Sequence, residues 1–217
     1  FDKDNDRRYM AQLPFSDFGE LIDPPSVDVT AHVLEMLGTV GYAQDFQAVR
    51  RGLEYIKRQQ ELDGPWFGRW GVNYIYGTGA VLPALKAVGE DMSQPYVRAA
   101  VDWLLNHQNE DGGWGESCAS YADPAWQGVG PSTASQTAWA LMALMAANEL
   151  DHPATYLGVA YLINTQNSEG SWDEPYFTGT GFPGYGVGER LKQIPTLEKR
   201  GHQGLELSAG FMINYHM

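Results

Sequence analysis

Asp28 and His32 are the two side chains in this sequence best suited to acid–base chemistry. On a helix, residues four apart lie on one face, and a carboxylate beside an imidazole favours the charged form of the ring. A cationic histidine held in this way can orient a nearby carboxylic acid and strengthen its acidity. Surface ion pairs with no catalytic role share this spacing, so the spacing alone leaves both interpretations open.

Two glycine-rich stretches, residues 66–79 and 172–184, bring several aromatic side chains together. The face of an aromatic ring carries negative charge and stabilises a nearby cation by about 0.5–2 kcal/mol. The same rings could stack on sugars or fill a hydrophobic core, and the pattern does not separate these uses.

A repeated pattern, Q-x-x-x-G-x-W, follows three apolar segments and recurs about every 50 residues, which is typical of helical repeats. The glutamines are Gln60, Gln108 and Gln166, and the tryptophans are Trp66, Trp114 and Trp172. The glycine permits a positive φ at a turn, the glutamine amide can cap a neighbouring helix, and the tryptophan buries about 200 Å². We therefore interpret the repeats as structural links between helices rather than as catalytic residues.

The segments between these motifs have helical spacing of apolar residues, and no alternating pattern of useful length predicts strands. Ser26 is a candidate N-cap for the first helix, which should end at Gly38, and Phe46 belongs to the apolar face of the second. The expected helices cover residues 26–37, 43–60, 75–88, 95–106, 132–148 and 153–165. Two helices in each repeat predict an all-α fold, an α–α toroid or part of an α6–α6 barrel.

The composition restricts the possible partners. A formal net charge of −13 argues against nucleic acid and against electrostatic binding to an anionic membrane. Cys118 is the only cysteine, so the chain has no internal disulfide and no thiolate zinc site, and a reducing compartment fits. We expect no metal and no organic cofactor, because ligand spacing and nucleotide motifs are both missing from the sequence.

Five segments of the chain resemble squalene-hopene cyclases, in the same order, and the repeats are similar to the QW motifs of triterpene cyclases. These segments are residues 14–32, 66–81, 108–121, 132–144 and 172–184. The resemblance implies a toroid around a large apolar cavity, in which an acid protonates squalene and the polyene folds into the fused rings of a hopanoid. It also implies aromatic faces that stabilise carbocations, and monotopic attachment to one leaflet, which in bacteria is the cytoplasmic face of the membrane.

The resemblance also assigns roles to individual residues. His32 corresponds to the histidine that hydrogen-bonds the catalytic aspartic acid, and Asp28 to the carboxylate partner of that histidine. Phe15 and Ser16 correspond to a constriction in the channel through which substrate enters. The aromatic residues that correspond to the cavity wall are Phe1, Trp70, Phe182, Phe211 and Tyr215.

Two departures from the family qualify these assignments. The acid motif D-x-D-D is absent, and Gly184 to Gly210 resembles an insertion whose role is open. We therefore expect residues 1–217 to be the C-terminal part of a catalytic barrel domain, inactive alone, without the acid-bearing segment and the second barrel domain. The expected partners are squalene or a similar linear terpenoid, a membrane surface and a second copy in a homodimer.

Other functions are compatible with parts of the sequence. Within the same family, the substrate could be oxidosqualene or another linear terpenoid. An α–α-barrel glycoside hydrolase or lyase would need paired acids near the aromatic loops, for which Asp173 and Glu174 are the candidates. A helical binding scaffold without catalysis is the third possibility.

Overall fold

The computed structural model describes residues 25–179, and this part of the chain is helical. It contains the α-helices α1 (Val27–Thr39), α2 (Gln47–Arg58), α3 (Tyr74–Ala87), α4 (Pro95–Asn106), α5 (Ala134–Ala146) and α6 (Pro153–Thr165). Two short 3₁₀ helices, η3 (Cys118–Tyr121) and η4 (Pro124–Trp126), lie in the loop before α5. Between residues 25 and 179 only isolated β-bridges occur, so the prediction of an all-α fold is confirmed.

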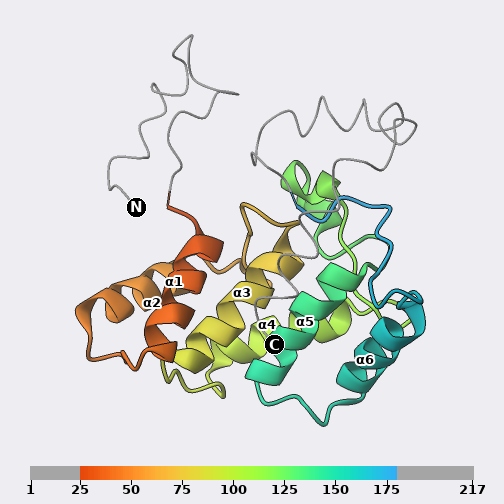
Figure 1. Cartoon of the computed structure of the whole chain (residues 1–217). Helices are drawn as coiled ribbons and strands as arrows, with labels where there is room; N and C mark the ends of the chain where they lie inside the picture. The colour runs from red at the N-terminus through yellow and green to blue at the C-terminus, as the bar shows by residue number, and fades with distance from the viewer. Residues whose placement is uncertain (1–24, 180–217) are drawn as a thin grey trace.

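The helices form three consecutive pairs, each with one central and one flanking member. The central helices α1, α3 and α5 lie side by side, with α3 in the middle, and α2, α4 and α6 flank them (Figure 1). The central helices all begin at the upper end of the molecule in Figure 1, where the loops after α2, α4 and α6 also lie. This arrangement is the one expected for part of an α–α barrel.

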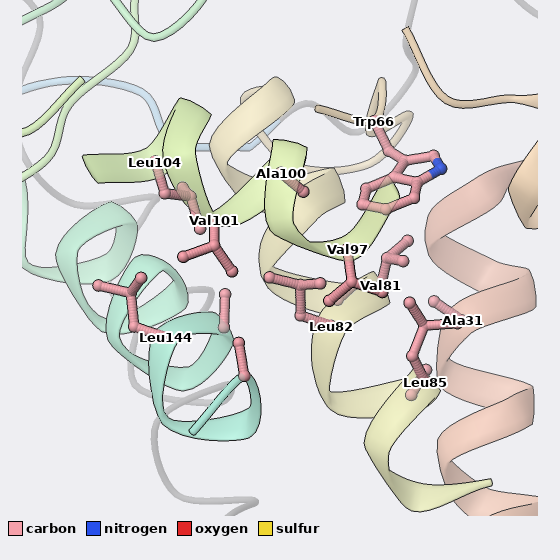
Figure 2. Packing of buried hydrophobic residues seen from close by; sticks show 14 of the residues in the cluster. Ala31, Trp66, Val81, Leu82, Leu85, Val97, Ala100, Val101, Leu104 and Leu144 are labelled. Atoms are coloured by element: carbon pink, nitrogen blue, oxygen red, sulfur yellow. The ribbon is translucent and has the colours of Figure 1, made fainter. Parts of the chain in front are cut away.

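The hydrophobic core lies between the central and the flanking helices. Helix α3 supplies Val81, Leu82 and Leu85, which are completely buried (Figure 2). Helix α4 packs against them through Val97, Ala100, Val101 and Leu104 (Figure 2). Because α3 is covered by α1, α4 and α5, nearly its whole surface is buried, which explains why its sequence lacks a polar face.

Most helix boundaries lie within two residues of the expected ones, and α1 ends at Thr39 rather than at Gly38. The starts of α2 and α5 have an identifiable cause. Helix α2 begins at Gln47 because the backbone of Phe46 is extended, and the Phe46 ring packs at a tilt against Tyr42 with centroids 4.5 Å apart. Phe46 is 41% exposed. Helix α5 begins at Ala134 because the Thr133 side chain accepts a hydrogen bond from the Gln136 N–H, as an N-cap does. Ser26 occupies the N-cap position of α1, but its side chain makes no capping hydrogen bond.

The three repeats form the same turn at the end of each flanking helix. Gly64, Gly112 and Gly170 have φ values of 116°, 86° and 81°, as the sequence predicts. The indole N–H of Trp66, Trp114 and Trp172 donates to Ile56, Leu104 and Leu162 respectively, over 2.9, 2.8 and 2.9 Å. Each indole therefore binds a backbone carbonyl in the last turn of the flanking helix that precedes it.

The repeat glutamines connect successive flanking helices. The Gln60 amide donates to the Gly64 carbonyl and to the Tyr96 carbonyl in the first turn of α4, over 2.6 and 2.8 Å. The Gln108 amide does the same with Gly112 and with Ala154 in α6, both over 2.8 Å. Gln166 makes the local bond to Gly170 over 2.9 Å. These bonds match the structural role that we inferred for the repeats.

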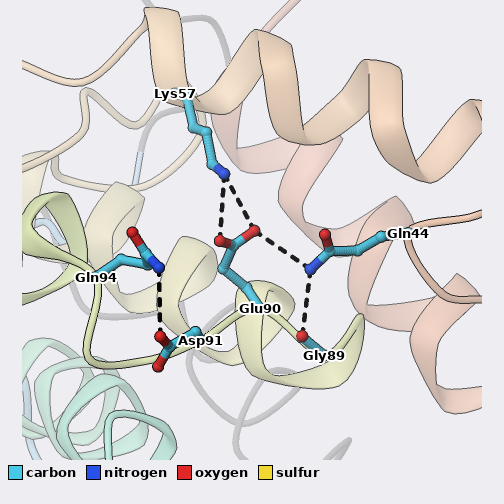
Figure 3. Close-up of polar contacts among 6 residues, drawn as sticks. All are labelled: Gln44, Lys57, Gly89, Glu90, Asp91 and Gln94. Atoms are coloured by element: carbon cyan, nitrogen blue, oxygen red, sulfur yellow. Dashed lines mark hydrogen bonds and ion pairs between the residues drawn. The ribbon is translucent and has the colours of Figure 1, made fainter.

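A polar cluster fastens α2 to the turn between α3 and α4. Glu90 accepts from the Lys57 ammonium at 3.2 Å and from the Gln44 amide at 3.4 Å, while Gln44 also donates to the Gly89 carbonyl (Figure 3). Asp91 accepts a hydrogen bond from the Gln94 amide beside this cluster.

None of the helices formed by the described residues has the length and apolarity needed to cross a membrane.

Candidate active site at the loop end of the central helices

The candidate site lies where the first turns of α1, α3 and α5 meet the loops that follow the flanking helices. We call this region the loop end, made of those three turns with residues 59–73, 107–133 and 166–179. The three loops are tied to one another here, because the Val72 N–H donates to the Thr178 carbonyl and the Tyr121 hydroxyl donates to the Gly71 carbonyl.

His32 lies one turn into α1 with its side chain 46% exposed. Its Nε2 is hydrogen-bonded to the Tyr76 hydroxyl of α3 at 3.3 Å, and its Nδ1 is 3.9 Å from a carboxylate oxygen of Glu35. When the phenol donates to Nε2, the ring proton resides on Nδ1. The imidazole is therefore oriented from one side by a phenol, while its exposed fraction leaves it accessible to a further group.

Asp28 is fully buried, and its carboxylate binds a neighbouring loop rather than His32, the partner that the resemblance implied. Its Oδ2 accepts the N–H groups of Arg69 and Trp70 at 3.1 and 2.9 Å. Across residues 25–179, no hydrogen bond or ion pair joins Asp28 to His32. The buried Oδ2 of Asp28 already accepts two N–H groups from the loop after α2, so this oxygen needs no contact with the exposed His32.

Tyr76 connects the histidine to the interior of the site. It is buried, and its ring packs edge-on against Trp139 of α5 with centroids 4.9 Å apart. Burial, and then the nearby charge of Asp28, raises the pKa of the Tyr76 phenol above its usual range. The phenol therefore stays protonated at neutral pH and can serve as a hydrogen-bond donor.

Trp70 and Trp66 have different environments although both belong to the first aromatic stretch. Trp66 is completely buried in the core, whereas Trp70 is partly exposed at the loop end with the Arg69 guanidinium 5.8 Å from its ring centroid. Of the two, Trp70 is the ring that a ligand could reach. The structure thus assigns Trp66 to the core and leaves Trp70 as a candidate for the cavity wall.

Glu116 is a buried carboxylate that faces the start of α3. Its Oε2 accepts the N–H groups of Asn73 and Ile75 at 3.1 and 2.9 Å. Gln136 holds the same segment, because its amide donates to the carbonyls of Val72 and Glu116 and accepts from the Glu116 N–H. Burial raises the pKa of the Glu116 carboxyl, and the backbone N–H donors counteract part of that effect.

Glu174 has the corresponding place at the start of α5. Its carboxylate accepts from the Ser135 N–H at 2.5 Å and from the Ser135 hydroxyl at 2.7 Å. A carboxylate engaged in this way is not available as one of a pair of hydrolytic acids, so the geometry offers no support for Asp173 and Glu174 as a glycosidase pair. No cluster of metal-ligating side chains occurs within the described part of the chain.

Several predicted site residues lie outside the described residues. The positions predicted for the substrate channel and part of the cavity wall, together with the insertion 184–210, belong to this group. The residues concerned are Phe1, Phe15, Ser16, Phe182, Phe211 and Tyr215. Their assignment therefore continues to rest on the resemblance alone.

Four side chains have roles in or beside the site that the sequence did not reveal: Tyr76, Glu116, Trp139 and Glu174. Tyr76 and Trp139 lie within helices whose residues are apolar on all sides, so no periodicity distinguishes them from core residues. The two glutamates did carry a signal, since each lies two residues after a repeat tryptophan.

Comparison with known proteins gives consistent results. The family model for the squalene-hopene cyclase C-terminal domain matches residues 1–187. The chain is 60% identical over 184 residues, 85% of its length, to a squalene–hopene cyclase of Alicyclobacillus acidocaldarius. It is 52% identical over 186 residues, 84% of its length, to a squalene–hopene cyclase of Bradyrhizobium diazoefficiens. It spans only 29% and 28% of the length of these two relatives.

A solved structure is similar in fold. The ent-copalyl diphosphate synthase from Streptomyces platensis superposes with a TM-score of 0.56 at 24% sequence identity. The match covers 81% of this chain and 33% of that protein. At this level of identity the likeness concerns the fold, which agrees with the helix pairs described above.

Proposed function

This chain belongs to the squalene-hopene cyclase C-terminal domain family, and on that premise we propose that it provides one side of the cavity of an enzyme that cyclises squalene. The observation that carries the proposal is the match over residues 1–187 together with the orientation of His32 by Tyr76. One ring nitrogen of His32 is hydrogen-bonded to a phenol, and the side chain is partly exposed. A histidine in this state can bind a carboxylic acid supplied by another part of the polypeptide.

The chemistry begins with a proton transfer. The acid gives its proton to the CH carbon of a terminal double bond of squalene. The π electrons of that double bond form the new C–H bond, and the dimethyl-substituted carbon of the double bond becomes a carbocation. Each later ring closes when the next double bond attacks the cation. Loss of a proton from the last cation then gives hopene, and addition of water followed by loss of a proton gives hopanol. His32, with its other nitrogen on Tyr76, fixes the acid in position and favours release of its proton.

The rest of the site must bind a hydrocarbon and stabilise positive charge. Trp70 is partly exposed, and its backbone N–H donates to the Asp28 carboxylate. A ring face in this position would stabilise a passing cation by about 0.5–2 kcal/mol. Phe1, Phe182, Phe211 and Tyr215 are proposed as further wall residues on the basis of the resemblance.

We propose that the reaction takes place at a membrane surface, and the resemblance to the family assigns it to the cytoplasmic face. The support is chemical: squalene is a hydrocarbon that partitions into lipid, so an enzyme that uses it must collect it from a bilayer. Phe15 and Ser16 are the proposed constriction on that path. Co-sedimentation with phospholipid vesicles tests this placement, and a polypeptide that converts squalene but stays in the supernatant would contradict it.

A chimera tests the proposed activity directly. The matching 184 residues of the Alicyclobacillus relative are replaced by those of this chain, and the chimeric protein is incubated with squalene. We expect pentacyclic hopene and hopanol, identified by mass spectrometry. Squalene left unchanged by a folded chimera would contradict the proposal, and turnover of oxidosqualene alone would assign the chain to the related substrate instead.

A further inference from the structure

The three repeats differ in one position that the loop end uses. Two residues after the repeat tryptophan, the second repeat has Glu116 and the third has Glu174, whereas the first has Gly68. Both glutamates point back to the central helix that precedes them in the chain. Glu116 accepts from Ile75 in α3, and Glu174 accepts from Ser135 in α5.

The two N–H donors occupy equivalent places. Ile75 is the second residue of α3, and Ser135 is the second residue of α5. The first-turn N–H groups of a helix have no partner within the helix, so a carboxylate from a loop satisfies them and favours the positive end of the helix dipole. Each of these loops is thereby joined to the first turn of the preceding central helix.

In the first repeat, the same connection is made in the opposite direction. The second residue of α1 is Asp28, and its carboxylate accepts the N–H groups of Arg69 and Trp70 in the loop that follows α2. Helix and loop are joined again by one carboxylate, but the helix now supplies the acceptor and the loop supplies the donors.

Steric constraints at Gly68 explain the reversal. A Cβ atom at Gly68 would lie 2.6 Å from the Asn73 carbonyl oxygen and 2.6 Å from Cδ1 of Tyr76. No side chain fits at this place, because the tyrosine that orients His32 packs against the loop. A carboxylate for this junction therefore has to come from the helix.

We infer that Asp28, Glu116 and Glu174 are one recurring structural element, a carboxylate that joins a loop to the first turn of the preceding central helix, and that Asp28 thereby positions Trp70. Asp28 is then a positioning residue that acts through the Arg69–Trp70 backbone and not through His32. Only one of its oxygens is used: Oδ2 takes both N–H groups, and Oδ1 has no hydrogen-bond partner among the described residues.

Comparison of Asp28→Asn with Asp28→Ala tests the assignment. Asparagine keeps one carbonyl oxygen for the two N–H groups but loses the charge, whereas alanine loses both. In the 217-residue chain, amide hydrogen exchange at Arg69 and Trp70 should accelerate at least about tenfold in Asp28→Ala, the loss expected for one or two hydrogen bonds. In Asp28→Asn it should stay within about threefold of the wild type.

Glu174 provides a matched second site, and the exposed Asp102 on α4 provides a control. Glu174→Ala should accelerate exchange at Ser135, Glu174→Gln should have a smaller effect, and Asp102→Asn should change neither amide. Unchanged exchange at Arg69 and Trp70 in Asp28→Ala would overturn the inference. So would equal acceleration in both Asp28 variants, because the inference requires the remaining oxygen of asparagine to hold the two N–H groups.

A turnover measurement adds a functional readout, and this part rests on the proposed function. In the chimera, the kcat for squalene should fall less in Asp28→Asn than in Asp28→Ala, in the same order as the acceleration of amide exchange at Trp70. A chimera without any activity would contradict the proposed function, whereas the exchange experiment would still decide the inference about Asp28.

Discussion

Glu116 illustrates how one buried side chain affects both the fold and the site. Its carboxyl has a raised pKa because burial disfavours the charge, yet it accepts two N–H groups at the start of α3, the helix that carries Tyr76. Protonation does not remove the acceptor, since the carbonyl oxygen of a neutral carboxyl can still bind these donors. Glu116 can therefore stabilise the start of α3 whether or not its carboxyl is protonated, and the free energy that it contributes depends on pH.

The sign of that dependence follows from linkage. A carboxyl whose pKa is higher in the folded than in the unfolded chain binds more protons when folded, so its contribution to stability falls as the pH rises above the usual glutamate range. Glu116→Gln keeps an acceptor oxygen and cannot ionise. We expect its melting temperature, relative to that of the wild type, to increase between about pH 4 and about pH 7.

Thermal unfolding monitored by circular dichroism at several pH values measures this difference. Glu110→Gln is the control, because Glu110 is an exposed carboxylate in the same loop. A relative melting temperature of Glu116→Gln that is constant with pH, or that falls as the pH rises, would show that the folded chain does not raise the pKa of Glu116.

At the scale of secondary-structure elements, the repeats act as links of unequal strength. Trp114 is completely buried between α4, α5 and α6, and Gln108 joins α4 to α6. Trp172 makes the same indole bond to Leu162, but it is partly exposed. The same motif should therefore contribute more to stability at the second repeat than at the third.

Alanine substitution of the two tryptophans checks this ranking. Trp114→Ala removes a fully buried aromatic side chain and should lower the free energy of unfolding by about 3–5 kcal/mol. Trp172→Ala should lower it by less than about 2 kcal/mol, because part of that ring is already in contact with water. Urea unfolding of the chain measures both values, and an equal or larger loss for Trp172→Ala would mean that exposure does not set the contribution of the repeats.

At the scale of the whole molecule, the sequence predicted the arrangement of helices better than the contacts between side chains. The apolar periodicity placed the six described α-helices, though not the two short 3₁₀ helices η3 and η4, because it reflects which face each helix buries. The repeat glycines marked the turns. The partner of Asp28 could not be predicted, since it consists of backbone N–H groups that belong to every residue and leave no mark in the sequence. Tyr76 was missed for a related reason, because a buried tyrosine on α3 resembles its apolar neighbours until His32 is placed beside it.

The structure also distinguishes a residue that should support catalysis, His32, from one that should support the fold, Gln108. His32 is partly exposed and held by one hydrogen bond to Tyr76, so its removal should leave the helix packing largely intact. The Gln108 amide donates to backbone carbonyls of its own turn and of α6, so its removal should affect stability and leave the chemistry unchanged. The two residues are therefore a matched pair for the central claim.

The most direct test compares the initial rate of squalene cyclisation in His32→Ala and Gln108→Ala chimeras, each at a temperature where circular dichroism shows it to be folded. Loss of a residue that supports proton transfer should lower kcat about 10²-fold or more, and we expect this for His32→Ala with a nearly unchanged melting temperature. Gln108→Ala should lower the melting temperature and keep kcat within a few-fold of the parent. Equal rates in the two variants, or a His32→Ala rate that matches the parent, would contradict the account.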